Sequence, residues 1–361
     1  MRRLFRRRIV LSAIALLLLT GLAGCWLYCH SDAAASLVAR KLEEQFGTPV
    51  RVDSLSIGVS GTSATGIRVY EHGTDPTGQP FLAVGSADVD VSAVGAATGA
   101  MPSALHLRDA HVVLRFDKNG NLVTRLPAAG AHGGSVPSVR IESGTLTLRQ
   151  EGRADSVFHG IDLTITPVDG RLTVSGTVED EAWGKWTAEG VIPLSGSEAA
   201  WLTLRTVAPQ RVTPDLLRQV PFVNPNAWTH VVLSGDTPAQ LELTFDSESR
   251  RVKYRVALEP TQTTVHIPSI GLVATDAAGS LVAEAGVVTL ANVRGRTANG
   301  GIRLDARLDF STPDSDMSFK AEVTDLDVRK LPPNWQLPTQ VEGRLSGNLE
   351  FRVMIPARGR T

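Results

Sequence analysis

The alternation of apolar and polar residues dominates most of the chain. From Val50 onward, apolar residues recur at every second position in many short runs, for example 52–59, 87–91, 112–116, 241–245 and 302–310. A period of two is typical of a β-strand with one buried face and one solvated face. Turn residues interrupt the pattern at roughly 8–12-residue intervals, so about twenty strands are predicted. The fold class is therefore predicted to be mainly β.

Several short segments predict the turns between these strands. Residues 141–148 and 282–290 each place a Glu and then a Gly between apolar runs, and both predict a β-hairpin. Residues 117–121, Asp-Lys-Asn-Gly-Asn, also predict a turn. Their spacing resembles a calcium-binding loop, but the Glu that such a loop needs at its twelfth position is absent. Hairpins that follow one another along the chain build extended antiparallel sheets.

Helical periodicity is rare in this chain. Residues 30–47 predict a short amphipathic helix that Ser31 or Asp32 can cap and that Gly47 ends. Thr213 and Pro214 predict the start of a second short helix. Two such helices cannot cover the apolar faces of all the strands. Those faces must pack on each other, belong to a closed sheet, or line a curved sheet whose apolar hollow holds an apolar ligand.

A basic cluster and an apolar run precede the β-rich part. Residues 1–8 contain five arginines, and residues 9–29 carry no charge. A helix of this length spans roughly 30 Å of hydrocarbon. Because arginine clusters stay in the cytoplasm, we expect a single-pass anchor in a bacterial inner membrane, with the N-terminus cytoplasmic and the bulk of the chain periplasmic. The residues expected to mark this anchor are Ile9, Leu16, Leu19, Trp26 and Tyr28.

Two alternatives to an uncleaved anchor stay open. A cleaved signal peptide has a similar basic and apolar pattern. Residues 22–25, Leu-Ala-Gly-Cys, fit a bacterial lipobox, which would make Cys25 an acylated N-terminus. Against cleavage, the apolar character continues through residues 26–29, whereas a mature lipoprotein usually begins with a polar linker. All three alternatives send the remaining chain across the inner membrane.

Composition and charge narrow the function classes. The net charge of −1 gives no electrostatic reason to expect a nucleic-acid partner. Both cysteines, Cys25 and Cys29, lie in the apolar run, so no disulfide framework supports the β-rich part. The eight histidines lack metal-ligand spacing, and no nucleophile, phosphate-loop or dinucleotide motif occurs. We therefore expect no catalytic site, no metal and no cofactor.

The apolar run and the amphipathic helix are followed by the stretches 44–52, 55–57 and 66–70, and later by 107–122, 281–306 and 341–347. In this order they resemble AsmA-like proteins, and the resemblance extends over nearly the whole chain. It implies an elongated, twisted, antiparallel-rich and taco-like β-sheet that forms a groove in the periplasm. It also implies transport of membrane phospholipids toward the outer membrane and a role in envelope biogenesis. Members of the group are often longer, which leaves room for a periplasmic or outer-membrane protein partner.

These patterns divide the chain into six segments. They are a cytoplasmic basic cap at 1–8, the anchor at 9–29, the amphipathic capping helix at 30–47, a first β-groove segment at 48–205, a short helix and loop segment at 206–230, and a second β-groove segment at 231–361.

Two function hypotheses differ in what covers the apolar strand faces. In the first, these faces line a groove that shields lipid acyl chains. In the second, they pack on each other as the dry core of a β-sandwich scaffold or stalk for envelope assembly. Glutamate at Leu243 or Leu304 would block lipid passage in the first case and unfold the protein in the second. The residues expected to line the groove are Leu55, Ile57, Val59, Val89, Val91, Leu243, Phe245, Leu304 and Leu308.

Overall fold

The computed structural model of the protein describes residues 32–58, 61–71, 78–92, 95, 102–126, 136–194, 198–223, 232–246, 249–312, 314–335 and 340–355. The described residues are mainly β and mostly antiparallel, with few helices, which confirms this part of the predicted fold class. They divide into two compact units. Unit 1 takes its described residues from Met1–Val113, Thr124–Leu146 and Thr164–Pro167, and unit 2 takes its residues from Leu114–Val123, Thr147–Leu163 and Val168–Thr361.

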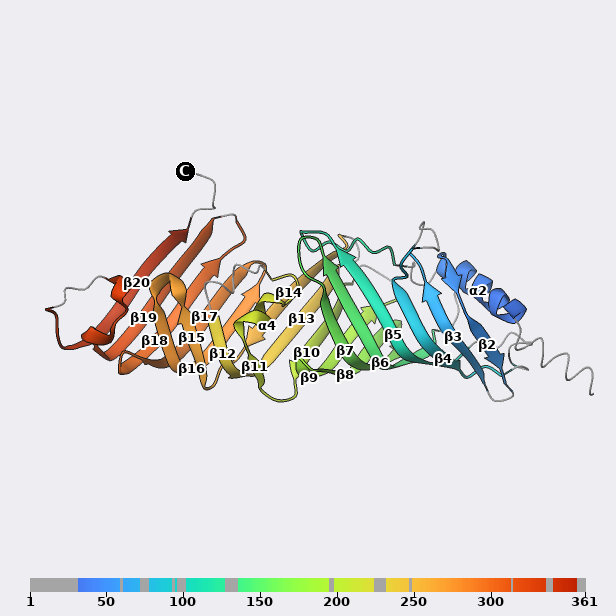
Figure 1. Ribbon diagram of the computed structural model, residues 1–361, viewed down its shortest axis with the longest axis horizontal. Helices are drawn as coiled ribbons and strands as arrows, with labels where there is room; N and C mark the ends of the chain where they lie inside the picture. Colours follow the sequence, from blue (N-terminus) through green and yellow to red (C-terminus); the bar gives the residue numbers. More distant parts are fainter. Residues whose placement is uncertain are drawn as a thin grey trace, which may run out of the picture. The chain divides into compact units, whose positions relative to one another are not determined.

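The elements follow one another along the chain as Figure 1 shows. Unit 1 contains α2 (Asp32–Phe46), β1 (Val50–Arg51), β2 (Ser54–Ile57), β3 (Thr62–Val69) and β4 (Leu82–Val89). Three longer strands contribute residues to both units: β5 (Ala104–Phe116), β6 (Ser138–Gln150) and β7 (Ser156–Val168). Unit 2 continues with β8 (Arg171–Asp180), β9 (Gly184–Pro193), β10 (Ala200–Thr206), β11 (Gln210–Val212), α4 (Pro214–Arg218), β12 (Val232–Thr237), β13 (Ala239–Asp246), β14 (Arg251–Leu258) and β15 (Thr263–Ile267). It ends with η1 (Pro268–Ile270), β16 (Leu272–Glu284), β17 (Val287–Thr297), β18 (Gly300–Asp309), β19 (Ser315–Asp327), η2 (Val328–Lys330), η3 (Pro333–Trp335) and β20 (Arg344–Ile355).

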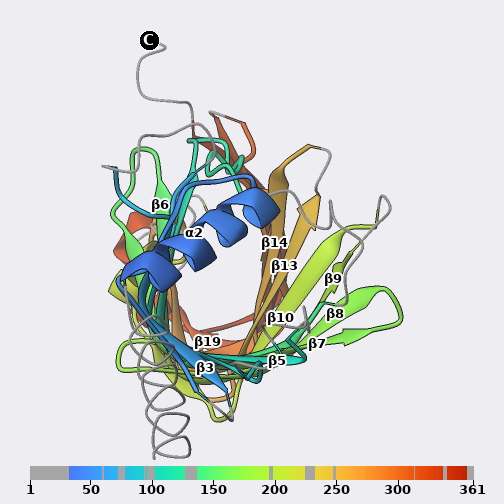
Figure 2. The same ribbon diagram turned by 90° about the vertical axis from the view of Figure 1, so that its right-hand side faces the viewer.

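Helix α2 covers an apolar face of the strands in unit 1 (Figure 2). Ala35 is 4% exposed and packs with Leu55 and Ala64, and Val38 lies beside them. Leu42, one further turn along the helix, packs on the neighbouring apolar cluster. Residues three and four apart share one side of a helix, so this spacing places the apolar stripe on the sheet. The predicted amphipathic helix is confirmed.

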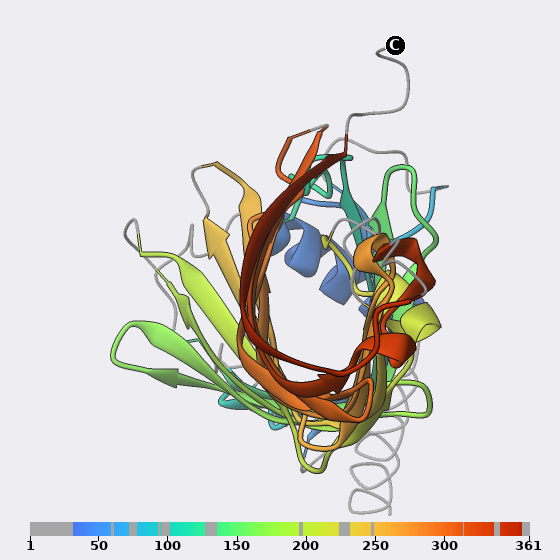
Figure 3. The same cartoon turned by 90° about the vertical axis from the view of Figure 1, so that its left-hand side faces the viewer.

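The main sheet of unit 2 has the strand order β8–β9–β10–β13–β14–β16–β17–β18–β19–β20, and every neighbouring pair is antiparallel. A second set of strands, β11, β12, β15 and the first part of β16, pairs separately. Strand β16 belongs to both sets, and its register with β17 shifts between Thr275 and Ser280. Figure 3 shows the last strands of unit 2, in red, curving so that one face of the sheet is concave.

The largest buried cluster of the described residues lies in unit 2. It joins apolar residues of β14 and β16–β19 to residues of the second set of strands, α4 and η2. Leu308, Met317 and Phe319 on the main sheet are each 0% exposed, as is Leu233 on β12. This part of unit 2 is therefore a closed core between two layers, because the second set of strands and the short helices cover the sheet.

One of the two predicted hairpins is confirmed and the other is wrong. Strands β16 and β17 meet at Ala285 and Gly286, whose φ angles of 48° and 80° are the left-handed pair that a type I′ hairpin turn needs. Residues 141–148 instead lie within the single strand β6. Ser143 has a φ of 55° inside that strand. The Glu-Ser-Gly segment therefore forms a local irregularity of the strand backbone, and the chain does not reverse there.

Side-chain oxygens stabilise two other predicted features, the turn at residues 117–121 and the start of helix α4. Asp117 Oδ1 accepts hydrogen bonds from the backbone N–H groups of Asn119 and Asn121, each at 2.8 Å, which confirms the turn. The Asn121 side chain also donates to Asp117 Oδ2 at 2.7 Å, and these hydrogen bonds lower the pKa of Asp117. Thr213 Oγ1 accepts from the backbone N–H of Leu216 at 3.2 Å, which confirms the capped start of α4.

Arg153 ties the turn between β6 and β7 to the segment that follows α4. Its guanidinium donates to the carbonyl oxygen of Val220 at 3.4 Å and to that of Val223, and both valines are buried. The same group donates to Gln150 Oε1 at 3.2 Å. Burial lowers the pKa of Arg153. This side chain therefore satisfies backbone carbonyls that have little access to water.

We expect Arg153→Met to lower the free energy of unfolding by about 1–3 kcal/mol, because buried carbonyls lose their donors while most of the side-chain volume remains. Urea denaturation followed by circular dichroism measures the change. Arg205→Met is the matched control, since Arg205 is exposed and its contacts to Gln240 and Glu189 are at the surface. Equal midpoints for the two variants would show that the Arg153 contacts contribute nothing.

The predictions for the N-terminus concern residues outside the described ranges. These are the anchor at 9–29, with Ile9, Leu16, Leu19, Trp26 and Tyr28, and the lipidation candidate Cys25. Within the part of the chain that the structure does describe, no helix has both the length and the apolar character needed to cross a bilayer.

Candidate functional site

Strand register aligns the apolar side chains of unit 2 on one face of its main sheet. Residues directly opposite each other in antiparallel pairs have side chains on the same face. From β9 to β20, the directly paired residues are Ala188, Leu204, Leu241, Val256, Ala283, Val288, Leu308, Met317 and Val353. The alternation in the sequence therefore becomes a continuous apolar row across nine strands.

Exposure divides this apolar face into two parts. On β18 the face is closed, with Leu304 at 3% and Leu308 at 0% exposure. On β10 and β13 the inward side chains are only half-buried. We call these half-buried residues the open strip, and they are Leu202, Leu204, Leu241, Leu243 and Phe245.

The four predicted groove residues of unit 2 fall on both sides of this division. Strand register places all four on the same face of the main sheet. Leu243 and Phe245 belong to the open strip and are accessible from solvent. Leu304 and Leu308 contact other core side chains. The first pair is therefore partly accessible to solvent, whereas the second pair is enclosed by protein.

The five predicted groove residues of unit 1 have different surroundings. Leu55 is 5% exposed and lies beneath α2, with Ile57 packed beside it. Val89 contributes to the lining of a pocket, and Val91 is half-buried. Val59 lies outside the described residues. Unit 1 thus uses at least part of its apolar face to hold its own helix.

The pocket in unit 1 has a volume of about 820 Å³ and a lining of mixed polar and apolar character. Ser63, Asp88 and His106 are directly paired across β3, β4 and β5, so their side chains share one face. The lining residues are Ser56, Gly58, Gly61, Thr62, Ser63, Asp88, Val89, Asp90, Ala104, Leu105, His106, Ser138, Val139, Arg140 and Thr164. The pocket therefore offers both polar groups and apolar surface to a ligand.

Most ionisable groups of this pocket already have partners in the sheet. Asp88 Oδ2 accepts from Arg108 at 2.8 Å, and His106 Nε2 lies 2.8 Å from Glu142 Oε2. Asp90 accepts hydrogen bonds from the Ser103 hydroxyl and from the Ser103 and Ala104 backbone N–H groups, which lower the pKa of Asp90. Asp88, Asp90 and His106 are thus held by ion pairs and hydrogen bonds within the sheet.

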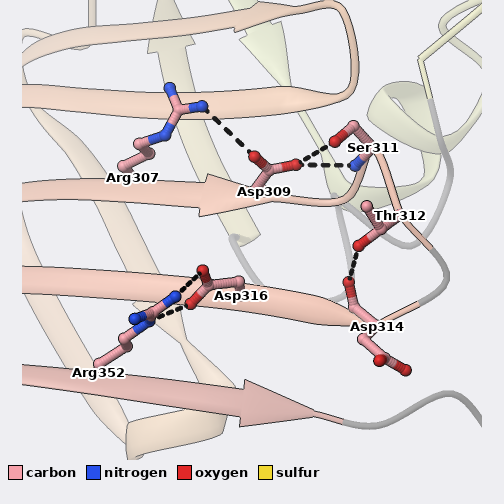
Figure 4. Close-up of polar contacts among 7 residues, drawn as sticks. All are labelled: Arg307, Asp309, Ser311, Thr312, Asp314, Asp316 and Arg352. Carbon is pink, nitrogen blue, oxygen red and sulfur yellow. Dashed lines mark hydrogen bonds and ion pairs between the residues drawn. The ribbon is translucent and has the colours of Figure 1, made fainter.

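The polar face of β18–β20 carries paired surface charges (Figure 4). Arg352 donates to both carboxylate oxygens of Asp316, at 2.7 and 2.5 Å, which lowers the pKa of Asp316. Asp309 accepts from the Ser311 hydroxyl at 2.5 Å and from its backbone N–H at 3.0 Å, which lowers the pKa of Asp309. Arg307 lies 3.3 Å from Asp309. Surface pairs of this kind organise a turn and a strand edge and add little stability.

Two features of the site have no clear signal in the sequence. The polar residues that line the pocket alternate with apolar ones, as on any solvated strand face. The strands that close the core, β12 and β15, show the same alternation as the strands of the open strip. Among the described residues, no group of three or more His, Cys, Asp or Glu side chains is arranged to hold a metal ion.

Comparison of the chain with protein-family models, with curated proteins and with solved structures finds no match. The similarity to AsmA-like proteins therefore stays a prediction from the residues that carry it.

Proposed function

We propose that the chain is an inner-membrane-anchored periplasmic protein whose open strip binds lipid acyl chains and contributes to phospholipid transport toward the outer membrane. The observation that carries the proposal is the open strip itself. Its five apolar side chains lie on one face of two adjacent antiparallel strands and stay half-exposed. Apolar side chains grouped on a solvent-accessible face can serve as a binding surface for a ligand or a protein.

The physics of such a carrier is passive. Each acyl methylene that the protein shields from water contributes about 0.8 kcal/mol. No catalytic group is required, in keeping with the internally paired ionisable groups of the pocket and of the polar sheet face. The basic cap, the apolar run at 9–29 and the resemblance to AsmA-like proteins support the proposed location and the phospholipid ligand.

A second candidate function is a non-catalytic β-scaffold or stalk for envelope assembly, and the closed core favours it. Leu308, Met317 and Phe319 have 0% exposure, so this section of the apolar face packs against protein and has no room for a ligand. Under this candidate, a protein partner covers the open strip. The two candidates thus differ in what contacts Leu243 in the cell.

Site-specific photocrosslinking in intact cells separates the two candidates. The photoreactive residue p-benzoylphenylalanine replaces Leu243 in the full chain, and mass spectrometry identifies the adduct after irradiation. A phospholipid adduct is expected at position 243. None is expected at Thr244, the matched control, because neighbouring residues of a strand face opposite sides of the sheet. A protein adduct at 243 without any lipid would favour the scaffold and end the lipid proposal.

A further inference from the structure

Strand β20 leaves one edge of the unit 2 sheet unpaired within the described part of the chain. It is 12 residues long and pairs with β19, and no other described strand pairs with it (Figures 1 and 3). An edge of this length offers a row of backbone N–H and C=O groups to another strand. Of the features that usually protect such edges, β20 has charged side chains on its polar face but no proline and no inward-pointing charge.

The apolar face is incompletely covered at this edge. On β19, Met317 and Phe319 are 0% exposed. Their partners on β20, Val353 and Phe351, are only half-buried, although Phe351 stacks on Phe319 with ring centroids 4.9 Å apart. Leu349, two residues before Phe351 on the same face, is 36% exposed. A further strand beside β20 would cover these side chains.

We propose that this further strand is β20 of a second copy of the chain, paired antiparallel about a two-fold axis at Phe351. Such an isologous contact requires one strand to be complementary to itself. With the axis at Phe351, the two phenylalanines face each other, and Leu349 lies opposite Val353 of the second copy. On the polar face, Glu350 lies opposite Arg352 of the second copy, and the symmetry forms this pair twice.

The charges next to β20 extend this complementarity. Within one copy, Arg352 binds Asp316 at 2.7 and 2.5 Å (Figure 4), and Lys320 Nζ lies 3.3 Å from Glu350. The pairing therefore produces two ladders of alternating sign, each running from Asp316 and Arg352 of one copy to Glu350 and Lys320 of the other. An axis at Glu350 or at Arg352 would instead place like charges directly opposite each other.

A second register, with its axis at Gly347, also pairs opposite charges. An axis at Gly347 places Glu350 opposite Arg344 and Arg352 opposite Glu342 of the second copy. That register also sets Gly347 against itself and leaves Phe351, Arg352 and Val353 opposite residues 341–343, which lie outside strand β20. The register at Phe351 joins residues 347–355 of each strand, and it extends the apolar face of one copy into the next.

Charge reversal in the full chain tests this pairing without reference to any lipid. Lys320→Glu with Glu350→Lys reverses one pair within the copy, and Asp316→Arg with Arg352→Glu reverses the other. Each double variant keeps opposite charges within the copy but places like charges between copies in the Phe351 register. Combining all four substitutions restores opposite charges in both places. Thermal melts followed by circular dichroism check that each variant is folded.

Sedimentation velocity of the purified chain in mild detergent, over a concentration series, measures the association. We expect a wild-type dimer, at least tenfold weaker association in each double variant, and a restored dimer in the fourfold variant. A monomeric wild type would overturn the proposal. Dimers that persist in both double variants would place the contact elsewhere, including in the N-terminal segment. Dissociation that the fourfold variant does not repair would also overturn it, because the Gly347 register predicts that result.

Discussion

Replacing Leu308 with glutamate is expected to unfold unit 2. Leu308 is 0% exposed and lies between its directly paired neighbours Val288 and Met317, which are 1% and 0% exposed. An ionised carboxylate at this position would have neither water nor a partner, and such burial costs several kcal/mol. The total stability of a domain is only about 5–15 kcal/mol, so one such change removes most of it. The milder Leu308→Ala is expected to cost about 2–5 kcal/mol by opening a cavity.

Circular dichroism and limited proteolysis would show the loss of structure. Thr289→Glu is the matched control, because Thr289 is exposed on the opposite face and is directly paired with Arg307. A glutamate there can form a cross-strand ion pair and should leave stability nearly unchanged. If Leu308→Glu melted at the same temperature as Thr289→Glu, the core of β16–β19 would have to be open to water, and the groove would extend through it.

The opposite outcome is expected for Leu243→Glu, which should leave the protein folded and remove bound lipid. Leu243 is half-buried in the open strip, so a carboxylate there can keep part of its hydration. The same charge disfavours an acyl chain beside it. Losing the shielding of two methylenes, at about 0.8 kcal/mol each, lowers occupancy roughly tenfold.

The measurement is the ratio of extracted phospholipid to purified protein, compared at matched melting temperatures. Thr244→Glu, on the opposite face of the same strand, is the control and should keep the wild-type ratio. A wild-type ratio in Leu243→Glu would remove the strip from the binding site. Unfolding of Leu243→Glu would mean that Leu243 packs into the folded core of the chain, and it would end the proposal that the strip binds lipid.

From the sequence alone, a glutamate at Leu243 and a glutamate at Leu304 are expected to have the same effect. The alternation of apolar residues makes Leu243 and Leu304 equivalent, as inward residues of two strands. In the structure they differ, because Leu304 is 3% exposed within the closed core and Leu243 is not buried. A glutamate at Leu304 would report on folding under either function, so only the open strip can distinguish a lipid carrier from a scaffold.

Local features of the fold were the most predictable from the sequence. The α2 helix, the Thr213 cap and the turn at Asp117 were all predicted correctly, because each depends on residues within a few positions of one another. The hairpin at residues 141–148 was wrong for the same reason. A Ser-Gly pair permits a turn, but residues 138–150 form one continuous strand, in which Ser143 has a φ of 55°.

By itself, the sequence determined which side chains share a face, since the period of two is a property of the extended backbone. It also determined where the helices and several turns begin. Only the tertiary structure decided which stretch of the apolar face is closed and which is open. That outcome depends on β12, β15, α4 and the short helices, which lie over β16–β19 and leave β10 and β13 half-exposed. The physical reason is that burial is set by contacts between residues far apart in the chain, and the alternation is the same on covered and uncovered strands.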